Sequence, residues 1–194
     1  MLALLLASAL ACQPASVTVE PTPKPVAATQ PAAADSAQNP PTTPPAQNQE
    51  KAEKRRFISA RTFQLDDLEV AKVKIGEHEF KLWVMDTYAK RMEGMMFLQN
   101  ADFKDDEGMI FVFDRAEYQR FWMRNTLVPL DIAYVDPRKR IINIYTMKAL
   151  DEVGDYSSRA PAQFVIELRA GMMAKKQIKA GMVVEIPATV KSKD

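Results

Sequence analysis

All the aromatic side chains of this 194-residue sequence lie in its C-terminal part. The two Trp, five Tyr and nine Phe residues occur at or after Phe57, whereas nine of the thirteen Pro residues lie between Pro14 and Pro45. A Pro-rich stretch without aromatic residues cannot bury enough apolar surface to offset the entropy that it loses on ordering. The sequence therefore predicts a disordered Pro/Ala/Thr/Gln-rich linker over residues 13–56 and a single globular domain over residues 57–194.

The charge balance of this domain argues against several classes of protein. Residues 1–56 contain 5 Lys/Arg and 4 Asp/Glu, so residues 57–194 contain 21 of each (26 − 5 and 25 − 4) and have no net charge. Nucleic-acid-binding surfaces are basic, and so are surfaces that dock on anionic lipid. One His and one Cys argue against zinc sites built from these residues and against disulfide frameworks. We therefore expect no nucleic-acid partner, no metal and no cofactor.

The first twelve residues have the character of an export signal. Residues 2–11 are small and apolar, and ten residues of helix span only about 15 Å, which is half the thickness of a bilayer core. This length is typical of the apolar region of a signal peptide. The stretch Ser8-Ala9-Leu10-Ala11-Cys12 resembles a bacterial lipobox, in which the Cys is lipidated and becomes the new N-terminus.

We therefore expect residues 1–12 to be a signal peptide ending in a lipobox-like Cys, with Cys12 carrying the lipid. The mature protein is then an exported, membrane-anchored lipoprotein on the periplasmic side or the cell surface, with the membrane as its partner through the N-terminal lipid. Secretion with cleavage nearby, and a misassigned start without export, are the two alternatives.

Short runs of alternating or continuous apolar residues dominate the domain, and they are rich in β-branched and aromatic types. The predicted strands are 68–75, 78–85, 109–113, 119–123, 130–135, 141–145, 164–168 and 182–186. The first two are expected to form a hairpin, with Gly76-Glu77 as its turn. Short helices are predicted over 87–93 and 172–179. Because crossovers of a dozen residues are lacking from this pattern, a βαβ array is excluded. We expect a mainly β fold, an antiparallel barrel or two-sheet sandwich with one or two short helices at an open end, preceded by the disordered Pro-rich tether.

The segment from Trp122 to Asp131 carries the densest group of polar side chains beside an aromatic residue. The candidate binding residues are Trp122, Arg124, Asn125, Thr126 and Asp131. Ligand sites combine an aromatic wall with a few fixed polar groups in this way. The alternative is a buried turn network in which Asp131 needs a partner, for which Arg124 is the candidate.

Three other groups of residues have a functional and a plain structural interpretation. His78 is expected as a solvated strand residue rather than a base. Met92, Met95 and Met96 stand at helical spacing and are expected to fill the core, although clustered thioethers also suit Cu(I). The acids at 151, 152 and 155 lack the ordered spacing of a calcium loop and are expected on the surface.

Several motifs together resemble the uncharacterised bacterial and archaeal "domain of unknown function" family number 192, from about residue 70 to residue 187. The specific part is Trp122-Met123-Arg124-Asn125-Thr126 followed by Pro129-Leu130-Asp131. The others are Met95 to Phe97 after Gly94, Gly108 to Phe113, Tyr156 to Ser158, Pro161 to Leu168 with Gly171, and Gly181. The resemblance implies a compact, mainly β domain, often exported or anchored, and no known reaction. The sequence departs from the family pattern at Met182, where Asp is usual, and at Ala149, where Pro is common.

Taken together, these features predict a non-enzymatic binding or accessory module at the cell envelope. Its expected ligand is a small molecule, a saccharide or an envelope protein. The alternative is an extracytoplasmic hydrolase or saccharide-processing enzyme that uses carboxylates such as Asp131 and Glu167.

Overall fold

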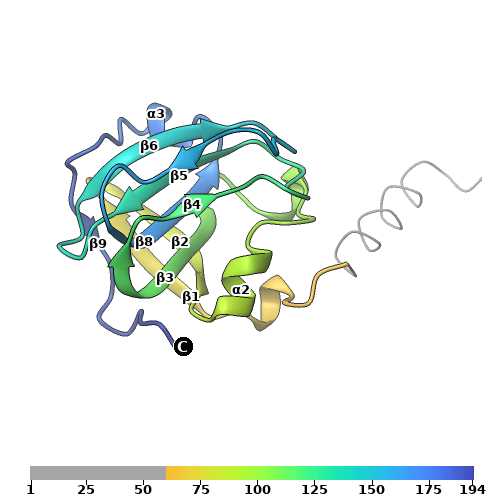
Figure 1. Cartoon of the computed structure of the whole chain (residues 1–194), viewed down its shortest axis with the longest axis horizontal. Coiled ribbons are helices and arrows are strands. Elements are labelled where there is room, and N and C mark those ends of the chain that lie inside the picture. The colour runs from red at the N-terminus through yellow and green to blue at the C-terminus, as the bar shows by residue number, and fades with distance from the viewer. Residues whose placement is uncertain (1–59) are drawn as a thin grey trace, which may run out of the picture. The chain divides into compact units, whose positions relative to one another are not determined.

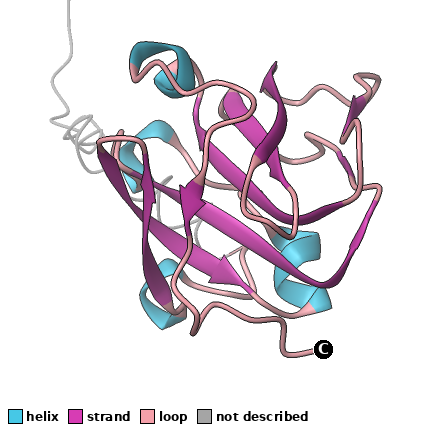
Figure 2. Ribbon diagram, turned by 90° about the vertical axis from the view of Figure 1, so that its left-hand side faces the viewer, coloured by secondary structure: helices cyan, strands magenta, loops and turns pink. Residues whose placement is uncertain are grey.

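A computed structural model describes residues 60–194 of the chain (Figures 1 and 2). The expected signal peptide, Cys12 and the linker over residues 13–56 lie outside these described residues. The strands are β1 (Val70–Ile75), β2 (His78–Met85), β3 (Glu107–Glu117), β4 (Arg120–Phe121), β5 (Leu130–Val135), β6 (Ile141–Met147), β7 (Tyr156–Ser157), β8 (Ala162–Arg169) and β9 (Val184–Glu185). The helices are α2 (Tyr88–Glu93) and α3 (Met172–Lys175), with 3-10 turns η1 (Leu65–Asp67) and η2 (Asn100–Asp102).

Seven strands form one curled sheet in the order β6-β5-β8-β3-β2-β1-β9, and β4 and β7 form a small second sheet. The two edges of the curled sheet meet, because Arg140 pairs with Val183 and the amide of Ile141 donates to the carbonyl of Met182 at 2.9 Å. Figure 1 shows the resulting half-barrel, with α3 at its upper side and α2 at its lower side. The predicted mainly β fold is confirmed.

The predicted hairpin of β1 and β2 is present, with Ile75 opposite His78 and a two-residue turn between them. Gly76 adopts φ +60° in this turn, a conformation that glycine takes without steric cost. The expectation that crossovers are lacking is wrong in one place. β2 and β3 are parallel, and residues 86–106, with α2 and η2, connect them. Parallel strands require such a connection, which the sequence pattern did not separate from an irregular loop.

The first predicted helix is also present as α2. The hydroxyl of Thr87 accepts a hydrogen bond from the amide of Lys90, and Gly94 at φ +48° ends the helix. The second predicted helix is shorter than expected and ends at Lys175, because Gln177 takes φ +55°.

The sheet separates two apolar cores. The interior core lies inside the curl and draws residues from all seven strands of the curled sheet and from α3, whose Met172 and Met173 close one end. The outer core lies on the convex face, under the segments that carry Met95, Leu98 and Met123. Each fully buried large apolar side chain stabilises the fold by about 1.5–3 kcal/mol, so both layers contribute substantially.

Polar contacts from both ends of the described chain hold α2 in place. Apolar burial contributes little, because none of the six residues of the helix is buried among the described residues. The guanidinium of Arg61 is buried, donates to the carbonyl of Gly94 at 2.9 Å, and lies 3.4 Å from the carboxylate of Glu93. At the other end of the helix, Asp194 accepts from the amide of Tyr88 at 2.8 Å and forms an ion pair with Arg91. Among residues 60–194, the helices are too short or too polar to cross a membrane.

The approach of β3 to β8 at Gly108 leaves no room for a side chain, because an added Cβ atom would stand 2.1 Å from the backbone oxygen of Glu167. We predict that Gly108→Ala lowers the free energy of unfolding by about 3 kcal/mol or more, since the strands must separate to admit a methyl group. Urea denaturation measures this change. A variant whose free energy of unfolding stays within about 1 kcal/mol of wild type contradicts this close approach of β3 to β8.

Candidate ligand-binding groove

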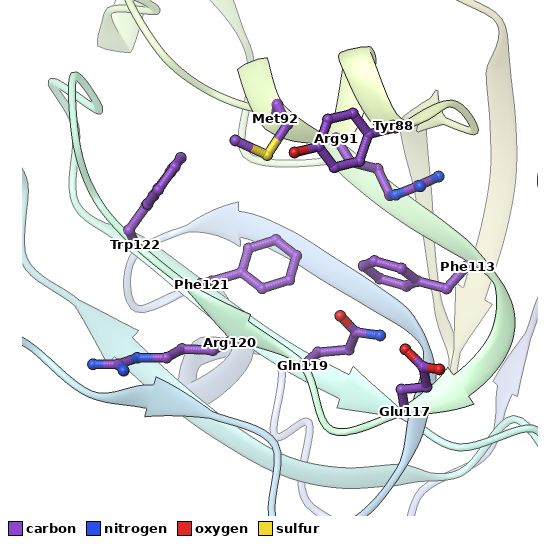
Figure 3. A pocket seen from close by; sticks show the side chains of 9 residues that line it. All are labelled: Tyr88, Arg91, Met92, Phe113, Glu117, Gln119, Arg120, Phe121 and Trp122. Carbon is purple, nitrogen blue, oxygen red and sulfur yellow. The ribbon is translucent and has the colours of Figure 1, made fainter. Parts of the chain in front are cut away.

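A groove of about 350 Å³ lies between α2 and the segment from Phe113 to Trp122. Figure 3 shows Tyr88, Arg91 and Met92 of α2 along one side and the residues of β3 and β4 facing them. We call this hollow the aromatic groove. Its lining residues are Tyr88, Arg91, Met92, Phe113, Glu117, Gln119, Arg120, Phe121 and Trp122.

The aromatic groove exposes large apolar side chains that a folded domain normally buries. Tyr88 is 67% exposed, Trp122 is 49% exposed and Met92 is 39% exposed. Phe121 packs edge-on against Phe111, with ring centroids 4.8 Å apart, and against Tyr134 at 6.0 Å. The wall of the groove is therefore anchored in the outer core, while its rim is open to solvent. Exposed apolar patches of this kind mark interaction sites.

The charged side chains of the aromatic groove are all engaged by other residues. The guanidinium of Arg91 pairs with Asp194 and lies 4.9 Å from the ring centroid of Phe113. Glu117 pairs with Arg115 at 2.6 Å. Arg120 lies 3.4 Å from the carboxylate of Asp155. The groove therefore presents apolar surface with its charges already balanced.

A small cavity of about 20 Å³ adjoins the aromatic groove, and the two share Arg91, Met92, Phe121 and Trp122 as lining. We call it the inner cavity. Its further lining residues are Glu93, Gly94, Met95, Met96, Phe111, Thr126 and Glu167. Glu167 of β8 is only 4% exposed, and its carboxyl group has no hydrogen bond or ion pair with any described residue. A buried acid without a partner is costly in a folded protein.

The surroundings of Glu167 are apolar on its own face of the sheet. Its cross-strand neighbours are Met109 of β3 and Ile132 of β5, both fully buried. Burial raises the pKa of Glu167 to about 8. The carboxyl group is therefore mostly protonated at neutral pH, and strongly perturbed acids of this kind cluster at functional sites.

Asp131 projects from the opposite face of the sheet. It stands opposite Leu168 of the interior core, one position along β8 from Glu167, and successive residues of a strand alternate between faces. Its carboxylate accepts hydrogen bonds from the hydroxyl of Thr146 at 2.7 Å and from the amide of Met173 at 2.9 Å. These groups, rather than the expected Arg124, are its partners.

The structure brings two of the five candidate residues to the site. Trp122 lines both the aromatic groove and the inner cavity, and Thr126 lines the inner cavity. Arg124 is exposed at a turn outside both linings. Asn125 occupies the same turn at φ +54°, and its carbonyl accepts from the amide of Phe97 at 2.9 Å. These turn contacts fit the structural interpretation of the motif, while Trp122 and Thr126 fit the binding one.

The other candidate groups have structural partners. Met95, Met109 and Met123 are buried in the outer core, as core packing predicts, whereas Met92 lies at the groove. Asp151 accepts hydrogen bonds from the hydroxyl of Tyr156 and the amides of Val153 and Gly154, and these contacts lower its pKa. No three His, Cys, Asp or Glu side chains within residues 60–194 gather as metal ligands do.

Sequence reasoning missed the contribution of α2 to the site. Tyr88 and Met92 stand four residues apart and so share one face of the helix. The structure buries neither of them. The signal available in the sequence was this pair of large apolar residues in a helix of only six residues. Arg61 and Asp194, which hold the helix, carried no sequence signal.

A second hollow, of about 420 Å³, lies between the ends of β3 and β8 and residues 186–192. Lys139 in its lining donates to the carbonyl of Ile186 at 2.6 Å. Its aromatic residues, Phe113 and Phe164, are half-buried and buried. The aromatic groove is the stronger candidate, because its aromatic residues are exposed and because it adjoins an unpartnered acid.

Comparison with known proteins agrees with the fold. The model of the family DUF192, described as "Uncharacterized ACR", matches residues 71–186. A protein of unknown function from Novosphingobium aromaticivorans DSM 12444 is 32% identical, with a TM-score of 0.59 over 64% of this chain and 91% of that one. A proposed transcription regulator from Sinorhizobium meliloti 1021 is 24% identical, with a TM-score of 0.58 over 61% of this chain and 95% of that one, and shows the fold alone. None of the curated proteins matches the sequence.

The buried acid makes stability depend on pH in a direction that can be measured. Because the pKa of Glu167 is raised in the folded protein, the unfolded chain loses its proton first, and stability falls as pH rises from about 4.5 to about 8. Each pH unit in this window costs about 1.4 kcal/mol. We predict that Glu167→Gln removes this decline and is more stable than wild type by a few kcal/mol at pH 8.5.

Urea denaturation at pH 4.5, 7.0 and 8.5 measures the difference. Glu117→Gln, which changes an exposed acid of the same groove, is the matched control and should keep the wild-type decline. Parallel pH dependence of wild type and Glu167→Gln contradicts the burial of an unpartnered acid.

Proposed function

This chain belongs to the DUF192 family, and we propose that it is a non-enzymatic binding module, tethered at the cell envelope, that takes its ligand in the aromatic groove. The observation that carries the proposal is the exposure of Tyr88, Met92 and Trp122 around a hollow of about 350 Å³. Ligand sites have this size and this combination of aromatic wall and few polar groups. Trp and Tyr also dominate the binding energy of many interfaces.

Arrangement of the carboxylates favours binding over hydrolysis. An enzyme that cleaves its substrate with a pair of carboxylates, as glycoside hydrolases do, needs the two acids to converge on one bond. Asp131 and Glu167 project from opposite faces of the sheet, and Asp131 is engaged by Thr146 and Met173. The pair that an enzymatic function required therefore lacks the geometry to act together.

The N-terminal sequence supports the envelope location. An apolar stretch over residues 2–11 precedes Cys12, the single Cys of the chain, and a Pro-rich stretch follows it. A lipid on Cys12 would anchor the chain, and the residues after it would give the domain reach from the membrane.

The groove is tested by removing one aromatic wall residue at a time. We predict that Trp122→Ala and Tyr88→Ala abolish complementation of a deletion strain while changing the free energy of unfolding by less than about 1 kcal/mol, since both side chains are exposed. Tyr118→Ala is the matched control, because Tyr118 is 72% exposed and does not line the groove.

The control variant should complement as wild type does. Equal complementation by all three variants, or losses that follow thermal stability alone, would remove the aromatic groove as the functional surface. Arg124→Ala, which lies outside the lining, should also leave function intact.

The anchor is tested separately. We predict that Cys12→Ser shifts the protein from the membrane to the soluble fraction or leaves it unprocessed, because the thiol is the site of lipid attachment. Membrane fractionation and the apparent mass of the mature chain measure this. Unchanged fractionation and mass would show that the chain is not a lipoprotein.

A further inference from the structure

One of the ionisable side chains that line the inner cavity has no described partner of opposite charge. Arg91 is paired with Asp194, and Glu93 is paired with Arg61. Glu167 is buried and has no described partner. A ligand that carries a positive charge into the inner cavity would supply the missing partner. A negatively charged ligand would be repelled by the carboxylate of Glu167.

The size of the inner cavity limits the charged group. A volume of about 20 Å³ holds one group the size of a water molecule. A primary ammonium group has this size, while a trimethylammonium group is several times larger. The adjoining aromatic groove, at about 350 Å³, has room for the chain that bears the ammonium group.

We propose that the aromatic groove binds a primary ammonium compound, with its ammonium group in the inner cavity against the carboxylate of Glu167 and its apolar chain along Trp122 and Phe121. This inference rests on the proposed function above and deepens it by naming the ligand class. Aromatic faces attract cations, and both rings line the inner cavity as well as the groove. The hydroxyl-bearing Thr126 also lines the inner cavity and offers an acceptor.

A cation gains more from this site than a neutral ligand does. With the pKa of Glu167 at about 8, binding a cation at pH 7 must release a proton, which weakens binding about tenfold. At an effective dielectric constant of about 20, the attraction between two unit charges 4 Å apart strengthens binding by about a thousandfold. A neutral ligand that accepts a hydrogen bond from the protonated acid gains about tenfold at most.

Binding should therefore depend on pH through Glu167. The other charged or titratable groups nearby are Arg91 and Glu93 of α2, which are in ion pairs, and Tyr134 of β5, whose hydroxyl donates to the carbonyl of Tyr156. Burial raises the pKa of Tyr134 well above its ordinary value, so it stays neutral in the range of interest. Affinity should fall about tenfold for each pH unit below about 8.

The test is an NMR titration of the full-length chain with defined probes. Hexylamine and N-acetyl-lysine methylamide carry the ammonium group on a free and on a peptidic chain. Trimethylhexylammonium keeps the charge with a larger head, and hexan-1-ol keeps the size without the charge. The indole signal of Trp122 reports binding, and that of Trp83, which lies outside both linings, is the internal reference. Glu167→Gln and the control Glu77→Gln, which changes an exposed acid outside both linings, are titrated in parallel.

We expect at least one of the two primary amines to bind with a Kd of about 1 mM at pH 8.5. Trimethylhexylammonium and hexan-1-ol should bind at least tenfold more weakly, and so should the primary amine to Glu167→Gln. Glu77→Gln should bind as wild type does. Which amine binds more tightly separates a free amine from a lysine side chain as the source of the group.

Equal binding of hexan-1-ol and hexylamine, or binding that Glu167→Gln leaves unchanged, overturns the cation inference while leaving the groove a binding site. No shift of Trp122 with any probe also overturns it. In that case the complementation result for Trp122→Ala and Tyr118→Ala, which uses no probe ligand, still decides the proposed function independently.

Discussion

β8 is hydrogen-bonded along both edges and buried on both faces, and the rest of the domain is arranged around this strand. It pairs with β3 on one side and β5 on the other, so its alternate residues enter the interior core and the outer core in turn. A polar residue in such a strand must find a partner within the protein or remain without one. Glu167 of β8 and Asp131 of β5, the equally buried neighbouring strand, show the two outcomes. Asp131 is hydrogen-bonded in the interior core, while Glu167 faces the inner cavity without a described partner.

The buried carboxyl group of Glu167 lowers the stability of the domain, and its position relates this cost to the inner cavity. An unsatisfied buried polar group costs about 1–3 kcal/mol, which is a large share of the stability of a small domain. Replacing Glu167 by an apolar residue would relieve it. The group instead lines the inner cavity, as Trp122 does, and the inner cavity shares lining residues with the aromatic groove. Buried acids of this kind are found where a ligand completes the site.

The aromatic groove owes its shape to contacts between distant parts of the chain. α2 provides one side of it and is held by Arg61 near one end of the described chain and by Asp194 at the other. These are charged contacts and hydrogen bonds rather than apolar packing, so Tyr88 and Met92 of α2 stay exposed. The fold itself carries no activity with it, since a fold serves many functions and the site decides among them.

Local patterns in the sequence were enough to predict the mainly β class, the β1–β2 hairpin with its turn at Gly76, and the helix between Thr87 and Gly94. Each depends on residues close together in the chain, where strand alternation, turn preference and capping act directly. The motif around Trp122 was also visible, and it supplied two residues of the candidate site. Only the tertiary structure decided that β2 and β3 are parallel, that α2 lines a groove, and which face of the sheet each carboxylate occupies. Those properties arise from pairing and burial between segments that are distant in the chain, such as Arg61 with Glu93 or Asp194 with Tyr88. Whether Glu167 has a partner depends on every residue around it at once, and no stretch of sequence contains that information.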